Sequence, residues 1–261
     1  MSEFALGGAL RGRRIVVTRP AEQNQRLVEL IRAEGGEAVV FPTIEIVGLG
    51  DSRAIEDAAD RLETYDLAVF ISPNAVDQAM SAIRARREWP RPLRAATIGR
   101  ASADALRRHG VSNIVAPSER FDSEALLELA ALADVAGWRI VIFRGEGGRE
   151  LLGDTLRQHG AIVDYVECYR RQRPNVDSAP LAVALSRGEI DAVIATSSEG
   201  LRNFVELIGA AGEAHLKRTP LFVPHFRIAE VARSLGCERV VETLPGDEGL
   251  AAGLARFWAK M

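Results

Sequence analysis

Hydrophobic residues fall into short runs that alternate with longer amphipathic stretches. The short runs are apolar or β-branched, and the stretches between them carry apolar residues every three or four positions, as on one face of a helix. Ten strands are predicted, at 14–18, 38–41, 67–71, 94–98, 113–116, 139–143, 161–166, 191–195, 220–223 and 239–242. This alternation indicates an α/β fold with parallel sheets covered on both faces.

Glycines mark the expected ends of several helices. We expect helices at 23–34, 100–109, 149–159 and 226–235, each followed directly by a glycine, the residue most often found just past a helix end. Histidines are scattered, and two precede such glycines, so we interpret them as residues of helix ends: His109, His159, His215 and His225.

The chain contains an internal repeat. Residues 12–42 align with 137–167 at a shift of 125, and 65–76 align with 190–201 at the same shift. A (β/α)8 barrel made of two halves would repeat at a similar distance. The pattern gives five strands per repeat rather than four, which favours two doubly wound, five-stranded parallel sheets.

Composition agrees with a globular chain of two domains. Of 261 residues, 47% are hydrophobic and 26% charged, and 33 Lys plus Arg against 36 Asp plus Glu give a net charge of −3. That balance suggests no nucleic-acid partner. The two cysteines lack a CxxC pair, which argues against a structural zinc site.

The sequence has neither a secretory signal nor an apolar run long enough to span a membrane. We therefore expect a cytoplasmic protein without membrane contact. We further expect a monomer whose first 11 residues form a loose tail.

Polar residues follow the strands of the predicted sheets, where doubly wound proteins bind their ligands. Two of these loops carry an arginine next to a helix start, a suitable anion site; their candidate residues are Thr18 and Arg19, and at the repeat-equivalent place Arg144, Gly145, Glu146 and Gly147. Either arginine alone could be a solvated side chain at an ordinary turn. Their equivalent positions favour binding.

Two further loops carry serine at a predicted helix start. Their candidate residues are Ser72, Pro73 and Asn74, and at the equivalent place Ser197, Ser198 and Gly200. Serine there caps the helix, and the backbone N–H groups of such a terminus also suit a carboxylate or phosphate. The GEGG at 145–148 matches neither the dinucleotide nor the phosphate-loop motif, so no nucleotide cofactor is predicted.

Tyr169 stands among Arg170, Arg171 and Arg173 at a candidate domain junction. Tyrosine in a strand is commonly a packing residue. At this position its phenol could instead reach a bound ligand and donate a proton.

Together these motifs resemble the uroporphyrinogen-III synthase family. The matching segments are IVVTRP at 15–20, FISPNAV at 70–76, VECYRR at 166–171 and ATSSEGL at 195–201, in an order that covers nearly the whole chain. The resemblance implies two flavodoxin-like domains joined by a two-strand linker. They would comprise 1–44 plus 172–261, and 45–171, with crossings near 42–47 and 166–172.

The resemblance also implies a reaction without cofactor or metal. Family members close hydroxymethylbilane, a linear tetrapyrrole rich in carboxylates, to uroporphyrinogen III with inversion of ring D and loss of water, in haem, sirohaem and cobalamin biosynthesis. Tyr169 matches the family's functional tyrosine and is expected to assist departure of the hydroxyl. The usual threonine of the family falls opposite Ile228, and Arg227 is expected to replace its carboxylate contact.

The implied partners are this small-molecule substrate and, transiently, hydroxymethylbilane synthase. A two-domain hinge protein that only binds an anionic metabolite is the alternative, and it is disfavoured because such binders are mostly exported. A nucleotide-dependent transferase is disfavoured by the missing phosphate motifs.

Overall fold

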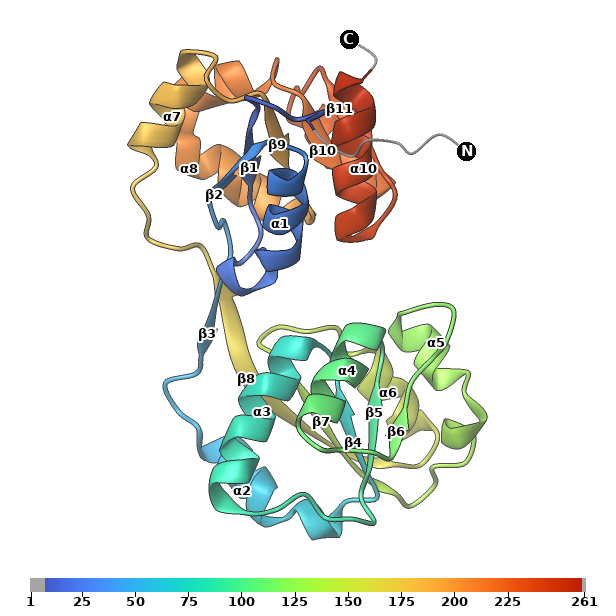
Figure 1. Cartoon of the computed structure of the whole chain (residues 1–261). Helices are drawn as coiled ribbons and strands as arrows, with labels where there is room; N and C mark the ends of the chain where they lie inside the picture. Colours follow the sequence, from blue (N-terminus) through green and yellow to red (C-terminus); the bar gives the residue numbers. More distant parts are fainter. Residues whose placement is uncertain (1–7, 260–261) are drawn as a thin grey trace. The chain divides into compact units, whose positions relative to one another are not determined.

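A computed structural model describes residues 8–259 and confirms the predicted α/β fold. The chain divides into two compact units (Figure 1). Unit 1 runs to Glu45 and resumes at Gln172, and unit 2 is Ile46–Arg171.

Unit 1 contains a five-stranded parallel sheet in the order β2-β1-β9-β10-β11. Its strands are β1 (Arg14–Val17), β2 (Glu37–Val40), β9 (Ala192–Ile194), β10 (Leu221–Val223) and β11 (Val240–Glu242). Its helices are α1 (Gln25–Ala33), α7 (Ala179–Ser186), α8 (Ser198–Leu216), α9 (Phe226–Ser234) and α10 (Gly246–Trp258). This is the 2-1-3-4-5 order of flavodoxin-like sheets, whose strand order reverses between β1 and β9.

Unit 2 contains a six-stranded sheet in the order β3-β8-β7-β4-β5-β6. Its strands are β3 (Glu45–Gly48), β4 (Leu67–Phe70), β5 (Arg94–Thr97), β6 (Ile114–Val115), β7 (Arg139–Gly145) and β8 (Ile162–Gln172). Its helices are α2 (Arg53–Asp60), α3 (Pro73–Arg86), α4 (Arg100–Arg108), α5 (Ser123–Leu127) and α6 (Leu151–Gln158). Without β3 the order is β8-β7-β4-β5-β6, which matches the 2-1-3-4-5 order of unit 1 when β7 and β8, the repeat equivalents of β1 and β2, are counted first. The reversal then lies between β7 and β4.

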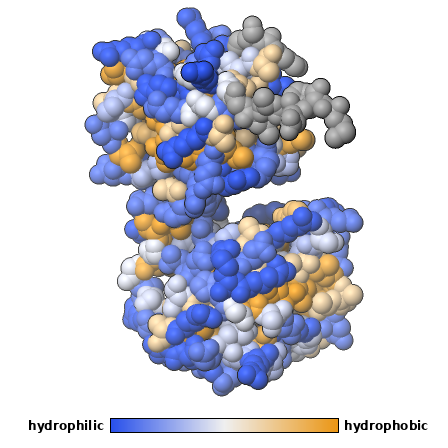
Figure 2. All heavy atoms as spheres, viewed as in Figure 1, coloured by the Kyte–Doolittle hydropathy of each residue, from blue (hydrophilic) through white to orange (hydrophobic). Residues whose placement is uncertain are grey.

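Both faces of each sheet are apolar because helices cover both. Alternate residues of a strand point to opposite faces: in unit 1, Val16 and Val193 pack with α7, α8 and α9, whereas Ile15, Val17 and Ile194 pack with α1 and α10. In unit 2 one core forms with α2, α3 and α4, and the other with α5 and α6. The outward surface visible in Figure 2 is mostly hydrophilic.

The two sequence repeats exchange their first halves. Strands β1 and β2 join β9 to β11 in unit 1, whereas β7 and β8 join β4 to β6 in unit 2. Equivalent residues make equivalent contacts: the Asp191 carboxylate accepts the backbone N–H of Arg14 at 2.9 Å, and Asp66 accepts that of Arg139 at 2.8 Å. Each aspartate thus ties together the amino ends of its two central strands.

The predicted strands are all present, and β3 is an additional one. The glycine-ended helices are confirmed as well: His109 and His159 are the C-caps of α4 and α6, and the next residues, Gly110 and Gly160, have φ of +74° and +89°. That left-handed conformation is strained for other residues.

The expected loose tail is wrong for its last part. Leu10 is fully buried among Ile15, Val17 and Ile31, and its backbone N–H donates to the carbonyl of Glu34 at 3.0 Å. An apolar side chain that reaches the core is held there by the area it removes from water. The first seven residues lie outside the described part of the chain.

Candidate functional site

The predicted loops lie at the strand-order reversals of the two sheets. In unit 1, β1 and β9 end side by side, and Thr18 fastens them: its hydroxyl donates to the carbonyl of Ile194 at 2.9 Å, and its backbone N–H donates to the same oxygen at 3.3 Å. Thr18 is only 3% exposed. Its hydroxyl is therefore engaged in a hydrogen bond within the sheet.

Arg19 is neutralised within unit 1. Its guanidinium forms an ion pair with Asp247 in the first turn of α10, and both side chains are largely buried. The Asn24 amide donates to the carbonyl of Arg19 at 3.2 Å. These contacts fix the loop after β1.

Ser197 caps α8 by accepting the backbone N–H of Gly200 at 2.9 Å, and Ser198 is the first residue of that helix. A Cβ at Gly200 would lie 2.9 Å from Ser197 Oγ and 3.1 Å from Thr43 Oγ1. The loop can close this tightly only because residue 200 is a glycine.

The loop after β10 presents Arg227 at the surface. His225 is the N-cap of α9 and accepts the backbone N–H of Arg227 at 3.2 Å. Arg227 is exposed, with its Cζ 5.8 Å from the ring centre of Phe226. Ile228 is 6% exposed, and its side chain packs in the core.

Arg144 of unit 2 is buried in a network of its own. Its Nη2 lies 2.9 Å from the Glu150 carboxylate and 3.4 Å from that of Glu167, and its Cζ lies 4.0 Å from the Tyr165 ring centre. Nη1 donates to the carbonyl of Gly148 at 3.2 Å, whereas the buried Nε has no partner in the described structure. Arg144 thus shapes the loop that follows β7.

That loop is closed further by the strand beside it. The Gly147 N–H donates to Glu167 Oε1 at 3.3 Å, and the Glu146 N–H donates to the carbonyl of Tyr169 at 2.8 Å. Gly147 has φ +68°. These bonds leave the Glu146 side chain exposed.

Tyr169 joins the two loops at the reversal of unit 2. Its Oη lies 3.0 Å from Ser72 Oγ, and Ser72 in turn caps α3 by accepting the Ala75 N–H at 3.1 Å. A Cβ on Gly145 would lie 2.7 Å from the Tyr169 ring. Pro73 and Asn74 are the first two residues of α3.

A pocket of about 380 Å³ opens between these loops in unit 2. Its lining includes five of the predicted residues: Arg144, Gly145, Glu146, Gly147 and Tyr169. Residues that the sequence reasoning missed also line it, among them Ile71, Ile98, Phe121, Asp122, Ser123, Arg149 and Arg171. Phe121 to Ser123 follow β6. The expectation that ligands bind in the loops after the strands could therefore have identified them.

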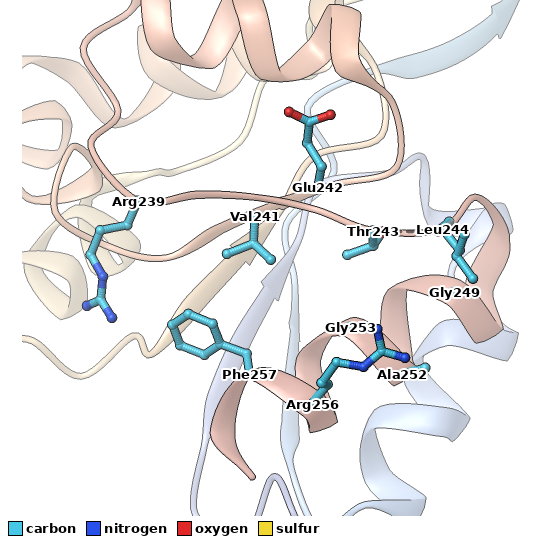
Figure 3. A pocket seen from close by; sticks show the side chains of 10 residues that line it. All are labelled: Arg239, Val241, Glu242, Thr243, Leu244, Gly249, Ala252, Gly253, Arg256 and Phe257. Atoms are coloured by element: carbon cyan, nitrogen blue, oxygen red, sulfur yellow. Dashed lines mark hydrogen bonds between the residues drawn. The ribbon is translucent and has the colours of Figure 1, made fainter. Parts of the chain in front are cut away.

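A pocket of about 690 Å³ lies in unit 1 between β11 and α10 (Figure 3). Figure 3 shows Glu242 pointing away from the other side chains; its carboxylate pairs with Arg233 at 2.9 Å. No residue of β1 or β9 lines this pocket. Although it is larger, it is therefore not at the strand-order reversal, and we favour the unit 2 pocket as the functional one.

The titratable groups near the unit 2 pocket favour binding over nucleophilic chemistry. The hydrogen bond from Arg144 lowers the pKa of Glu150, and burial raises the pKa of the Tyr165 phenol. Burial also raises the pKa of Cys168 to about 12, so this thiol stays protonated at neutral pH.

The described residues, 8–259, contain neither a candidate metal cluster nor a candidate membrane-spanning helix. Among these residues no cluster of three His, Cys, Asp or Glu side chains could hold a metal ion. Within the same range, no helix has both the length and the apolar character needed to cross a membrane.

Fold and site together define a duplicated, two-unit α/β protein with a pocket at the strand-order reversal of unit 2. Residues 25–252 match the family model described as "Uroporphyrinogen-III synthase HemD". The chain is 38% identical over 231 residues to the uroporphyrinogen-III synthase of Salmonella typhimurium, covering 87% of this chain and 93% of that protein. The Escherichia coli enzyme is 37% identical over 228 residues, with the same coverage. The chain belongs to the uroporphyrinogen-III synthase family.

Solved structures agree on the fold. A mutant uroporphyrinogen III synthase from Thermus thermophilus matches with a TM-score of 0.63 at 20% identity, covering 95% of this chain and all of that one. The Helicobacter pylori synthetase matches with a TM-score of 0.58 at 14% identity, covering 94% and 99%.

Proposed function

We propose that this chain closes hydroxymethylbilane to uroporphyrinogen III, with inversion of ring D and loss of water. The observation that carries the proposal is the unit 2 pocket, whose lining includes Tyr169, Arg149 and Arg171, in a chain 38% identical to a protein named for this activity. Arg149 forms an exposed ion pair with Glu124 at 2.8 Å, which a substrate carboxylate can displace at little cost.

The substrate's carboxylates would bind at the loops rather than at Arg19 and Arg144. Both arginines already pair with carboxylates of this chain, and displacing a buried partner is costly. We propose that they hold their loops in shape. Backbone N–H groups of helix starts and exposed arginines then supply the anion contacts.

Tyr169 is the proposed proton donor. Ser72 Oγ accepts the Ala75 N–H, so its own hydroxyl proton is available to Tyr169 Oη, which leaves the phenol proton for a ligand in the pocket. Transfer of that proton to the departing hydroxyl releases water and leaves an azafulvene electrophile. The phenolate regains a proton when the closed ring rearomatises, so the cycle balances.

The remaining steps depend mainly on how the protein positions ring D of the substrate. The substituted carbon of ring D attacks the electrophile to give a spiro intermediate, which fragments and recloses. Spontaneous closure gives the type I isomer. The enzyme therefore has to position ring D so that closure with inversion is faster than spontaneous closure. The reaction is a carbon–oxygen lyase step. Transient contact with hydroxymethylbilane synthase stays a prediction.

The test is a product assay with a matched control. Freshly made hydroxymethylbilane is supplied, the products are oxidised, and the type I and III isomers are separated. We compare wild type with Tyr169→Phe and with Tyr65→Phe. Tyr65 is also buried and donates one hydrogen bond, to Asp164 at 2.7 Å, but lies at the amino end of β4.

We expect type III excess from wild type and Tyr65→Phe, and a clearly smaller excess from Tyr169→Phe. An excess that survives Tyr169→Phe would keep the activity and make this phenol a packing residue. Type I alone, at the spontaneous rate, would refute the proposed activity and favour a hinge-type binder.

A further inference from the structure

One arginine of the unit 2 pocket forms a weak ion pair. Arg149 lines the pocket, and its Nη2 donates to Oε1 of Glu124 at 2.8 Å. The Arg149 side chain is 68% exposed, and among residues 8–259 its guanidinium has no second partner. Arg144 of the same pocket is held far more firmly, because its side chain is only 9% exposed and two carboxylates bind it. An exposed pair with a single hydrogen bond is the easier of the two for a ligand to break.

The Arg149–Glu124 pair connects two parts of the pocket wall. Arg149 lies in the loop between β7 and α6, whereas Glu124 lies in the first turn of α5. The three residues that precede Glu124 also line the pocket: Phe121, Asp122 and Ser123. A carboxylate of the protein itself is therefore bound to a cation of the pocket.

This position satisfies only half of the Glu124 carboxylate. Oε1 accepts the hydrogen bond from Arg149, whereas Oε2 is buried and has no hydrogen-bond partner among residues 8–259. A buried oxygen without a partner has lost its contacts with water and gained nothing in return. Because the side chain as a whole is 45% exposed, a rotation of the carboxylate into water would hydrate both oxygens. The release of Glu124 from Arg149 should therefore cost little free energy.

The kind of ligand that can replace Glu124 follows from the chemistry of the pair. A guanidinium binds a carboxylate through its fork of N–H donors, and the proposed substrate is rich in carboxylates. A substrate carboxylate at Arg149 would exchange one anion for another, so the guanidinium stays paired. A ligand without a carboxylate would leave the Arg149–Glu124 pair intact and gain nothing from this arginine.

We infer that Glu124 competes with the substrate for Arg149 and thereby sets the affinity of the unit 2 pocket: on binding, a substrate carboxylate takes the place of the Glu124 carboxylate. This inference rests on the proposed function. It adds that a residue in the wall of the pocket weakens substrate binding, and that it does so through Arg149.

The experiment removes the competing carboxylate. Glu124→Gln keeps the size of the side chain, Glu124→Ala removes it, and both are compared with Arg149→Ala and with the double variant Arg149→Ala/Glu124→Gln. Glu128→Gln is the matched control: Glu128 is the C-cap of the same helix and pairs with Arg120 at 2.6 Å, and neither residue lines the pocket. KM and kcat for type III formation are measured, with thermal unfolding to verify folding.

Breaking an exposed ion pair changes an equilibrium constant by up to about fivefold. We expect both Glu124 variants to lower KM by roughly two- to fivefold with little change in kcat, since the competition affects binding. Arg149→Ala should raise KM. In that background Glu124→Gln should have a much smaller effect, because the competition requires Arg149. Glu128→Gln should match wild type.

The outcomes separate this inference from the proposed function. A higher KM in both Glu124 variants would overturn the inference, because Glu124 would then orient Arg149 toward the substrate. An unchanged KM, a loss of kcat alone, or an equal decrease in KM with and without Arg149 would also overturn it, in a series where wild type makes type III. Type I alone from wild type would overturn the proposed function and the inference with it.

Discussion

The phenol oxygen of Tyr169 lies 3.0 Å from the hydroxyl oxygen of Ser72, and this contact joins the last part of β8 to the first turn of α3. Tyr169 is 3% exposed. The hydrogen bond is therefore shielded from water, and it holds the helix start that forms one side of the strand-order reversal in unit 2.

We predict a measurable coupling between these two residues. Ser72→Ala removes a helix cap and a hydrogen bond, about 2 kcal/mol together, and Tyr169→Phe removes one hydrogen bond, about 1 kcal/mol. The double variant should lose about 1 kcal/mol less than the sum. Urea unfolding measures this. Ser197→Ala, which removes only the equivalent cap, should cost about 1 kcal/mol and add independently to Tyr169→Phe.

Gly145→Ala should displace the Tyr169 ring through a steric clash. The new Cβ would lie 2.7 Å from Tyr169 Cζ and 3.0 Å from its Oη, so the ring has to move. We expect a loss of about 1–3 kcal/mol in unfolding free energy, together with lower type III output. Gly50→Ala is the control, since nothing lies within 4 Å of a Cβ there; equal effects of the two substitutions would contradict this account.

Local signals in the sequence were enough to predict the α/β class and its strands, whereas the expected division into two domains rested on the family resemblance. The repeat placed Asp66 on Asp191 and Ser72 on Ser197, and the structure shows the same backbone contacts at both members of each pair. These contacts lie close to the strand ends, and hydrophobic periodicity identifies those ends. They could therefore be predicted from the sequence pattern.

The partners of the arginines could not be predicted in this way. Asp247 pairs with Arg19 from a helix near the other end of the chain, and Glu167 reaches Arg144 from the neighbouring strand. Such pairs depend on side-chain placement in the folded unit, which spacing does not encode. The direct substrate contacts of the loop residues stay predictions for the same reason.

The Arg144 network predicts a pH effect on stability. Its hydrogen bond lowers the pKa of Glu150 from the ordinary 4.5, so the charged carboxylate is favoured in the folded state. This stabilisation is present above pH 4.5 and is lost as the pH falls through the lowered pKa.

Thermal unfolding between pH 3 and 7 tests that effect. Glu150→Gln should lower the melting temperature at neutral pH, and the difference from wild type should shrink below about pH 4.5. Glu88→Gln, which removes an exposed carboxylate without an ion-pair partner among residues 8–259, should show no such trend. A Glu150→Gln difference that is constant with pH would mean that the pair does not form.

Arg227→Ala should weaken substrate binding without affecting the fold. Arg227 is exposed at the carboxyl edge of unit 1, next to the buried Ile228, at the position where the family resemblance leads us to expect a threonine. Loss of one exposed anion contact, about 1 kcal/mol, corresponds to a KM increase of roughly fivefold. Because the contact is electrostatic, the increase should diminish as salt is raised. Arg32→Ala is the matched control: Arg32 is also exposed, but in the last turn of α1, at the amino edge of the same sheet. An unchanged KM for Arg227→Ala would show that this arginine does not replace the missing threonine.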